Sequence, residues 1–273
     1  MAYDAATGTA VLFGGYSVPH ELGDTWTWDG TTWTEQHPAA SPTPRDSQAM
    51  AYDAATGTVV LFGGLGTRNQ LGDTWTWDGT TWTKQHPATS PPARELAAMA
   101  YDPAAGTVVL FGGYGSHGIL ADTWTWDGTT WTKQHPAVHP LARGEEALAY
   151  DTAAGTLMLF GGHNAHRPLG GTWTWDGTTW TKQHPATSPP HLGSAATVYD
   201  AATGTVVLFG GFGARRPLGG TWTWDGTTWT EQAPAVQPTA RASSAMAYDT
   251  ATGTAVLFGG SNSQYLSDTW TWG

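Results

Sequence analysis

Ionisable side chains gather at one register of this sequence, a few residues before each recurrence of a Tyr-Asp pair. The register reads Arg45-Asp46-Ser47-Gln48, Arg94-Glu95, Arg143-Gly144-Glu145-Glu146, Leu192-Gly193-Ser194 and Arg241-Ala242-Ser243-Ser244. A guanidinium fork binds carboxylates, and a carboxylate accepts hydrogen bonds from amides and hydroxyls. Together these groups could hold a polar ligand or a peptide.

A second set of residues follows each Gly-Gly pair and is rich in rings. The residue after Gly-Gly is Tyr16, Leu65, Tyr114, His163, Phe212 or Ser261, and beyond it lie Arg68, Arg167, Arg215 and Arg216. Aromatic rings present broad apolar faces that can stack on sugars. The candidate ligand-binding residues are Tyr16, Arg45, Asp46, Gln48, Arg68, Arg94, Glu95, Tyr114, Arg143, Glu145, Glu146, His163, Phe212, Arg215 and Arg241.

Both sets also have a structural interpretation. An arginine repeated at one register, as Arg45, Arg94, Arg143 and Arg241 are, is typical of a scaffold residue that bonds the carbonyls of a neighbouring unit. Single aromatic residues on loops need no ligand to explain them, and differences between loops fit neutral drift. The sequence leaves these alternatives open.

A metal site finds little support in the spacing. The histidines that share one register are His37, His86, His135 and His184. Zinc needs three or four ligands about 2 Å from one point, whereas equivalent positions of successive units diverge. The chain has no cysteine, so thiolate ligands and thiolate nucleophiles are absent. We expect no structural metal and no cofactor.

Aspartates at a third register are weak candidates for catalysis. They are Asp24, Asp73, Asp122 and Asp268, and glycine replaces them at Gly171 and Gly220. A catalytic group needs no copy in each unit, and a hydrogen bond that closes a loop explains a repeated aspartate better. No Ser-His-Asp set or carboxylate pair rises above the repeat background, so we assign no catalytic residue.

The elements that must position these residues come from one unit copied six times. A Tyr-Asp pair recurs every 49 residues, at Tyr3, Tyr52, Tyr101, Tyr150, Tyr199 and Tyr248. The second copy contains four short runs rich in Val, Phe, Tyr, Trp and Thr, at residues 48–53, 58–63, 73–77 and 80–85. Such runs separated by turn residues predict a four-stranded antiparallel meander, and no window has a helical period.

The turns and the alternation support this prediction. Asp78-Gly79 lies between two tryptophan-bearing runs and predicts a hairpin, because glycine tolerates a positive φ. In the turn from Asp53 to Gly57 the aspartate can bond its own backbone. Trp75 and Trp77 alternate with threonine, so both face the same side of the sheet.

Four strands in a period of about 50 residues predict a β-propeller, because so small a meander must pack between two neighbours. Phe62-Gly63-Gly64, the segment from Asp73 to Asp78, Trp82 and Arg94 resemble the kelch repeat. Kelch repeats usually have Tyr-Asp where Trp77-Asp78 stands. The prediction is a single all-β domain over residues 1–273, a six-bladed kelch-like β-propeller with four-stranded antiparallel blades.

The two ends fall at particular points of the unit. Residues 1–4 align with 50–53 inside a first strand, and Trp272-Gly273 follows a third strand. The last blade is therefore expected to lack its outer strand: either the chain is a fragment, or a blade with an open edge is tolerated. An unpaired edge at residues 268–272 can recruit another strand, which predicts a monomer or an edge-paired homodimer.

Composition excludes several classes of partner. The formal net charge is −11, and only 12% of residues are charged. A phosphate backbone requires clustered Lys and Arg, so no nucleic acid partner is expected. No run is apolar enough to cross a membrane, and no signal peptide precedes the first repeat.

The favoured function is non-enzymatic binding or scaffolding, with a protein loop or a glycan on the face formed by the variable loops. The alternative is an engineered or model repeat propeller without an evolved ligand. A third alternative is an enzyme, since the kelch resemblance extends to copper-radical oxidases and sialic-acid isomerases. The copper-radical reaction requires a tyrosine cross-linked to a cysteine, which this chain lacks.

Overall fold

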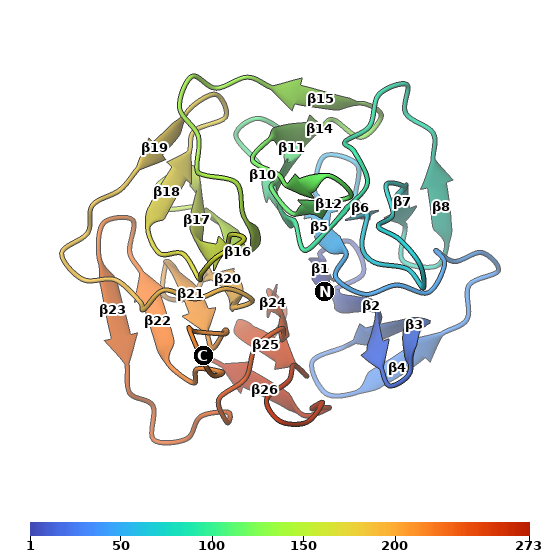
Figure 1. Ribbon diagram of the computed structural model, residues 1–273. Helices are drawn as coiled ribbons and strands as arrows, with labels where there is room; N and C mark the ends of the chain where they lie inside the picture. Colours follow the sequence, from blue (N-terminus) through green and yellow to red (C-terminus); the bar gives the residue numbers. More distant parts are fainter. The chain divides into compact units, whose positions relative to one another are not determined.

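The computed structural model describes residues 1–273, and every regular element in it is a β-strand. The strands form seven antiparallel sheets (Figure 1). The model contains no helix that could span a membrane. The all-β prediction is confirmed.

Each of the six copies forms one meander, in which strands adjacent in sequence are hydrogen-bonded neighbours. Sheet 1 contains β1 (Ala2–Asp4), β2 (Thr9–Ser17), β3 (His20–Trp28) and β4 (Trp33–Gln36). Sheet 2 contains β5 (Ala49–Asp53), β6 (Thr58–Phe62), β7 (Thr74–Trp77) and β8 (Trp82–Gln85). Sheet 3 contains β10 (Ala98–Asp102), β11 (Thr107–Phe111), β14 (Thr123–Trp126) and β15 (Trp131–Gln134).

The remaining copies follow the same order. Sheet 4 contains β16 (Gly144–Asp151), β17 (Thr156–His163), β18 (Thr172–Trp175) and β19 (Trp180–Lys182). Sheet 5 contains β20 (Ala196–Asp200), β21 (Thr205–Phe209), β22 (Thr221–Trp224) and β23 (Trp229–Gln232). Sheet 6 has only three strands, β24 (Ala245–Asp249), β25 (Thr254–Phe258) and β26 (Thr269–Trp272).

The seventh sheet was not expected from the repeat. It joins three two-residue strands, β9 (Arg94–Glu95), β12 (Tyr114–Gly115) and β13 (Gly118–Ile119). These strands lie in the connections between the longer elements, where propensity is weak and pairing depends on tertiary contacts. Elsewhere the predicted strand ends in the second copy are correct to within two residues.

The two repeated turns form as predicted. The Asp53 carboxylate accepts a hydrogen bond from the Ala55 N–H at 3.0 Å, and Gly57 has φ +70°. Asp78 accepts from the Thr80 and Thr81 N–H groups, and Gly79 has φ +96°. The Asp-Gly hairpin therefore joins the third and fourth strands, with Trp77 opposite Trp82.

The chain divides into two compact units. The first comprises Met1–His135 with Asp249–Thr252, and the second comprises Pro136–Tyr248 with Gly253–Gly273. Inside the first unit the Ala251 N–H donates to the Tyr3 hydroxyl at 3.2 Å.

Within each unit, neighbouring sheets are joined by the tryptophan that begins the fourth strand. Trp131 is 1% exposed; its indole N–H donates to Thr74 of the preceding sheet at 2.9 Å, and its ring packs edge-on against Phe62 at 5.3 Å. Trp82 with Thr25 and Phe13, and Trp229 with Thr172 and Phe160, repeat the arrangement. Each such ring buries roughly 200 Å², so this contact dominates the packing between sheets.

Sheet 6 differs at its outer edge. In the structure β26 pairs with β25 and lies at the edge of this three-stranded sheet. Beside it lies an apolar groove lined by Phe209, Thr221, Leu257 and Trp270. Phe209 and Thr221 occupy the positions at which Phe160 and Thr172 receive Trp229 one copy earlier.

Candidate functional site

The repeated arginines are buried and tie each connection to the sheet that follows it. Arg45 is fully buried. Its backbone bonds Gly15 and Leu22 of the first copy, while its guanidinium Nη1 donates to the Gly63 carbonyl of sheet 2 at 2.9 Å. A Cβ added at Gly63 would lie 2.5 Å from the Arg94 carbonyl oxygen, which explains the glycine at this close approach.

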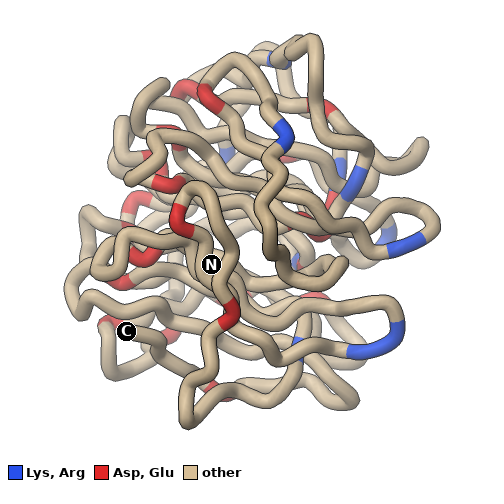
Figure 2. Tube along the Cα trace, turned by 90° about the vertical axis from the view of Figure 1, so that its left-hand side faces the viewer, with Lys and Arg blue, Asp and Glu red and all other residues tan.

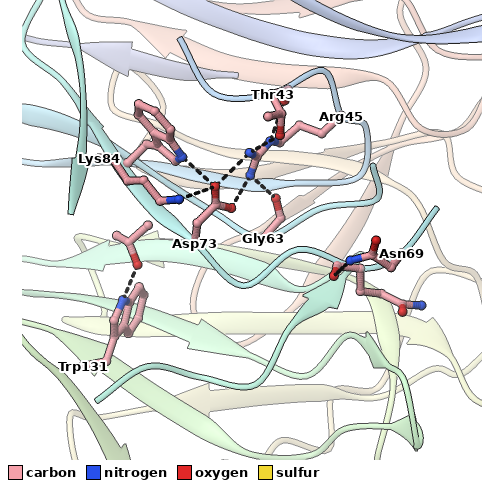
Figure 3. A network of polar contacts seen from close by, with 10 residues as sticks. Thr43, Arg45, Gly63, Asn69, Asp73, Lys84 and Trp131 are labelled. Carbon is pink, nitrogen blue, oxygen red and sulfur yellow. Dashed lines mark hydrogen bonds and ion pairs between the residues drawn. The ribbon is translucent and has the colours of Figure 1, made fainter. Parts of the chain in front are cut away.

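The same guanidinium holds an aspartate at the start of the third strand (Figure 3). Arg45 Nη1 lies 2.7 Å from Asp73 Oδ1, and the Trp75 indole N–H donates to Oδ2 at 2.8 Å. Lys84 Nζ approaches the same oxygen at 4.0 Å. Burial acts to raise the pKa of Asp73, but the hydrogen bonds from Arg45 and Trp75 outweigh it and hold that pKa below its usual value.

Two further copies repeat this network. Arg94 pairs with Asp122 at 2.7 Å, and Arg241 pairs with Asp268. The hydrogen bond from Arg241 lowers the pKa of Asp268 to about 2, although burial opposes it. The repeated aspartates thus act through hydrogen bonds and an ion pair. The guanidinium groups of these three arginines are occupied inside the chain.

A strained backbone position follows each arginine register. Ser47, Leu96, Glu145, Ser194 and Ser243 all have positive φ, between 55° and 64°. Residues other than glycine rarely adopt this conformation, which costs about 1 kcal/mol or more. It is held by backbone bonds between successive copies: Leu96 N–H to Ser47 O at 2.8 Å, and Ser194 N–H to Glu145 O at 2.8 Å.

One polar cluster in the second unit joins residues of three connecting segments. His163 Nδ1 lies 3.0 Å from Glu145 Oε2, and the Ser194 hydroxyl donates to the same oxygen at 2.7 Å. The His163 and Glu145 side chains are 19% and 21% exposed, so a ligand can reach them. The carboxylate lies between serine and histidine, whereas a nucleophilic triad needs histidine in the middle.

The other candidate residues divide by exposure. Tyr16 and Phe212 are exposed at 40% and 39%. Arg68 and Arg215 are also exposed, and Tyr114 is half-buried in β12. Glu95 accepts a hydrogen bond from Gln70 at 3.0 Å. By contrast, Arg143 and Glu146 are buried.

Two candidates are engaged locally. The Asp46 carboxylate accepts from the Ser47 hydroxyl at 2.6 Å, and the Gln48 side-chain amide donates to the Phe13 carbonyl. No group of three or more histidine, aspartate or glutamate side chains is arranged to hold a metal. The candidate residues chosen from the sequence did not include Ser194, which bonds Glu145, or Gln70, which bonds Glu95. Ser194 occupies the same register as Glu145, so the sequence did contain a signal for it.

The two ends of the strands differ in charge. The turns that repeat from copy to copy carry aspartates such as Asp53 and Asp78, whereas exposed arginines such as Arg68 and Arg215 lie on the variable loops. Figure 2 marks the acidic and basic residues along the Cα trace. In the second unit the variable loops therefore carry the exposed Phe212 ring, the exposed Arg215 and the Glu145 cluster.

A family model described as the KLHDC2/KLHL20/DRC7 Kelch-repeats domain matches residues 2–146, which is more than half of the chain. The chain belongs to this Kelch-repeat family. The kelch resemblance carried by the Gly-Gly pairs and the tryptophans is thereby confirmed. No curated protein matches the chain.

Proposed function

We propose that this kelch-repeat chain is a non-enzymatic binding or scaffold protein whose ligand contacts the loop end of the strands. The observation that carries the proposal is the contrast within each copy. The Arg–Asp ties recur in three copies and the buried tryptophan pairs in four, while the residue after each Gly-Gly pair changes, for example to the exposed Tyr16 and Phe212 and the half-buried His163. A rigid frame that presents different side chains is the usual design of a binding surface.

A protein loop is the favoured ligand. Kelch-repeat domains typically bind protein partners. In the second unit the exposed Phe212 ring, the exposed Arg215 and the Glu145–His163 pair supply an apolar anchor and directional polar groups on the variable loops, and Tyr16 is an exposed ring on a variable loop of the first unit. Tyrosine and arginine are enriched where binding energy concentrates in protein interfaces. A glycan stacked on the rings is the second candidate.

The proposed architecture is a single domain of residues 1–273 with six blades, sheets 1 to 6. The indole N–H groups of Trp82, Trp131 and Trp229 each donate to a threonine of the preceding sheet. This repeated contact between adjacent sheets supports one blade per copy. In this architecture the small sheet of β9, β12 and β13 belongs to the loops and is not a blade. An engineered or model propeller without an evolved ligand is the competing proposal.

The open edge of β26 supports a second contact, with another copy of the chain. The groove beside it has an aromatic floor at Phe209 and a hydroxyl at Thr221, the two groups that hold an indole elsewhere. An edge-paired homodimer would place a strand of the partner along β26.

The test of the ligand proposal pans a constrained-peptide library and a glycan array against the whole chain. Loop-end variants Tyr16→Ala, Phe212→Ala and Glu145→Gln are compared with turn-end variants Thr31→Ala and Thr80→Ala. We expect hits that lose at least tenfold in affinity with the loop-end changes and are indifferent to the turn-end changes. Absence of hits from both libraries would favour a repeat protein without an evolved ligand.

A further inference from the structure

The groove between sheets 5 and 6 keeps the two groups that hold a tryptophan in other copies. Trp229 begins the fourth strand of sheet 5; its indole N–H donates to the Thr172 hydroxyl at 2.8 Å, and its ring packs edge-on against Phe160 at 5.2 Å. The same two groups in the next copy are Thr221 and Phe209, and both line the groove. Sheet 6 has no fourth strand in the structure, so no equivalent tryptophan lies on them.

The contact is reproduced closely wherever these groups are filled. For Trp82, Trp131 and Trp229 the indole nitrogen lies 2.9, 2.9 and 2.8 Å from the threonine hydroxyl, and the ring centroids lie 5.4, 5.3 and 5.2 Å from those of the phenylalanines. All three tryptophans are 1% exposed. A threonine and a phenylalanine in this arrangement therefore form a specific site for an indole ring, with a hydrogen-bond acceptor at its polar edge.

The other walls of this groove are also in place. Leu257 of β25 and Trp270 of β26 line it from sheet 6, and Val236 lines it from the connection after sheet 5. One copy earlier the register of Val236 is Thr187, whose hydroxyl donates to the Trp229 carbonyl at 2.6 Å. The connection after each sheet thus passes the backbone of the tryptophan that fills the site.

The edge strand β26 defines how an added strand would lie. In sheets 1 to 5 the fourth strand is antiparallel to the third, and its first residue, a tryptophan, lies opposite the last residue of the third strand. In this register a strand on β26 has a tryptophan opposite Trp272 and its third residue opposite Trp270. The backbone groups of an edge strand supply hydrogen bonds for such an addition.

The third residue of the added strand meets a favourable site for a positive charge. In sheet 2 the Lys84 ammonium lies 5.9 Å from the Trp75 ring centroid and 4.0 Å from Asp73 Oδ2. The corresponding groups in sheet 6 are Trp270 and Asp268. The Asp268 side chain is 42% exposed, against 18% for Asp73, so a lysine can approach it.

A folded second copy is a poor source of the indole. Its fourth-strand tryptophans Trp82, Trp131, Trp180 and Trp229 are each 1% exposed, because they are held within their own chain. A second copy can pair its backbone with β26, but to fill the groove it would have to unfold a sheet. A tryptophan on an extended segment outside any sheet has no such cost.

We propose that the groove binds a short extended peptide with the pattern Trp-Thr-Lys, which adds to β26 as a fourth strand. The indole N–H donates to the Thr221 hydroxyl, the ring packs against Phe209, and the lysine lies over Trp270. This site is separate from the loop-end surface. It rests on the open edge of β26 proposed above as a contact, so the peptide and a second copy compete for it.

Fluorescence anisotropy of a labelled peptide tests the site on the chain of 273 residues. The peptide is Asp-Gly-Thr-Thr-Trp-Thr-Lys-Gln, the sequence of residues 78–85. It should bind saturably. Serine in place of the tryptophan should lower the affinity by about tenfold or more, because the buried ring is lost. Glutamate in place of the lysine should lower it about threefold.

Variants of the chain test the predicted contact. Thr221→Val removes the acceptor and keeps the shape of the side chain, so it should weaken binding of the tryptophan peptide about fivefold and leave the serine peptide unaffected. The matched control is Thr172→Val, which makes the same change at a hydroxyl already bonded by Trp229. The control should bind the peptide with the affinity of the parent chain.

Light scattering after gel filtration separates this ligand from a second copy. Peptide binding to a monomeric chain, or dissociation of a dimer by the peptide, supports the inference. A dimer that the peptide leaves intact would overturn it while supporting the edge-paired homodimer. The inference also fails if the tryptophan and serine peptides bind equally, if the two valine variants have equal effects, or if no saturation is seen up to about 1 mM peptide.

Discussion

The two ends of each sheet are held by different kinds of contact. The turn end carries the repeated aspartate turns, and the loop end carries the variable loops. At the turn end an aspartate such as Asp53 binds the backbone N–H groups that follow it, within its own copy. At the loop end Arg94 joins the backbone of the second copy to Asp122 of the third. The comparison teaches that local turns shape each sheet, whereas buried ion pairs fix one sheet to the next beneath loops that are free to vary in sequence.

The largest loss of stability is expected from a change at Trp131. This residue begins a fourth strand at the turn end, and its indole bonds Thr74 at the loop end of the preceding sheet. Trp131→Ala should lower the free energy of unfolding by about 3–5 kcal/mol, because it leaves a cavity against Phe62 and an unpaired Thr74 hydroxyl. Urea unfolding measures it. Trp272→Ala, at a half-buried position on the open edge, is the control and should cost about 1 kcal/mol. Equal costs would mean that Trp131 does not join the sheets.

Removing the carboxylate at the loop end should have the next largest effect. Asp122→Ala leaves Arg94 buried without its partner and should cost about 3 kcal/mol in unfolding free energy. The matched control is Asp24→Ala, because Asp24 accepts a hydrogen bond from the Trp26 indole but pairs with no arginine. This variant should lose about 1 kcal/mol of unfolding free energy. If both cost the same, the ion pair adds nothing to the hydrogen bond.

The same ion pairs predict a dependence on pH. The folded-state pKa of Asp268 is about 2, and those of Asp73 and Asp122 are lowered, against about 3.9 in an unfolded chain. Their stabilisation is therefore complete above about pH 4 and is lost as pH falls through the folded-state values. Urea midpoints between pH 5 and pH 2 should fall less steeply for Asp122→Asn than for the parent chain. Parallel curves would contradict this.

The open edge offers a smaller, stabilising test. A Thr-Thr-Trp-Thr-Lys-Gln strand appended after Gly273 should fill the groove at Phe209 and Thr221 and raise the Tm by about 4 °C. The same extension with serine for tryptophan should gain less. In the parent chain, amides of Thr269–Trp272 should exchange faster than those of Thr123–Trp126. Equal exchange rates and an unchanged Tm would show that the edge is already covered.

The smallest change in stability is expected at the exposed loop positions. Phe212→Ala and Arg215→Ala should lower the unfolding free energy by no more than about 1 kcal/mol, because Arg215 is exposed and Phe212 is 39% exposed. A loss above about 1 kcal/mol for either variant would indicate that the residue stabilises the fold and is not free to serve as a binding residue.

The sequence allowed much of the fold to be predicted because its determinants are local. The turn residues Asp53, Gly57 and Gly79 and the alternating tryptophans act within a few positions, so strand ends followed to within two residues. The partner of Arg45 could not be predicted the same way, since Asp73 lies 28 residues away and only the fold brings them together. The joint absence of arginine and aspartate at Leu192 and Gly220 was nevertheless a readable sign of that pairing.

The candidate site was harder for the same reason. Glu145 and His163 are 18 residues apart, and Ser194 meets them from the next copy. The loop side chains that converge here depend on the backbone conformation at Glu145, which has a positive φ. The residue types at this register do not indicate a positive φ, so the sequence did not predict it. The short strands β9 and β12 likewise pair across connections of unrelated sequence.

The bonds from each arginine register to the next sheet have a consequence for how such a chain can arise. The guanidinium groups of Arg45, Arg94 and Arg241 each reach a glycine carbonyl of the copy that follows, and the backbone N–H groups of Leu96 and Ser243 bond Ser47 and Ser194 of the preceding register, so these bonds join adjacent copies only. A 49-residue copy that carries both the arginine and the aspartate, as the second and third copies do, would therefore meet matching donors and acceptors if it were duplicated in frame. Recombination between copies of such a gene could change their number without creating a mismatched joint, and selection would act on the loops of each copy separately.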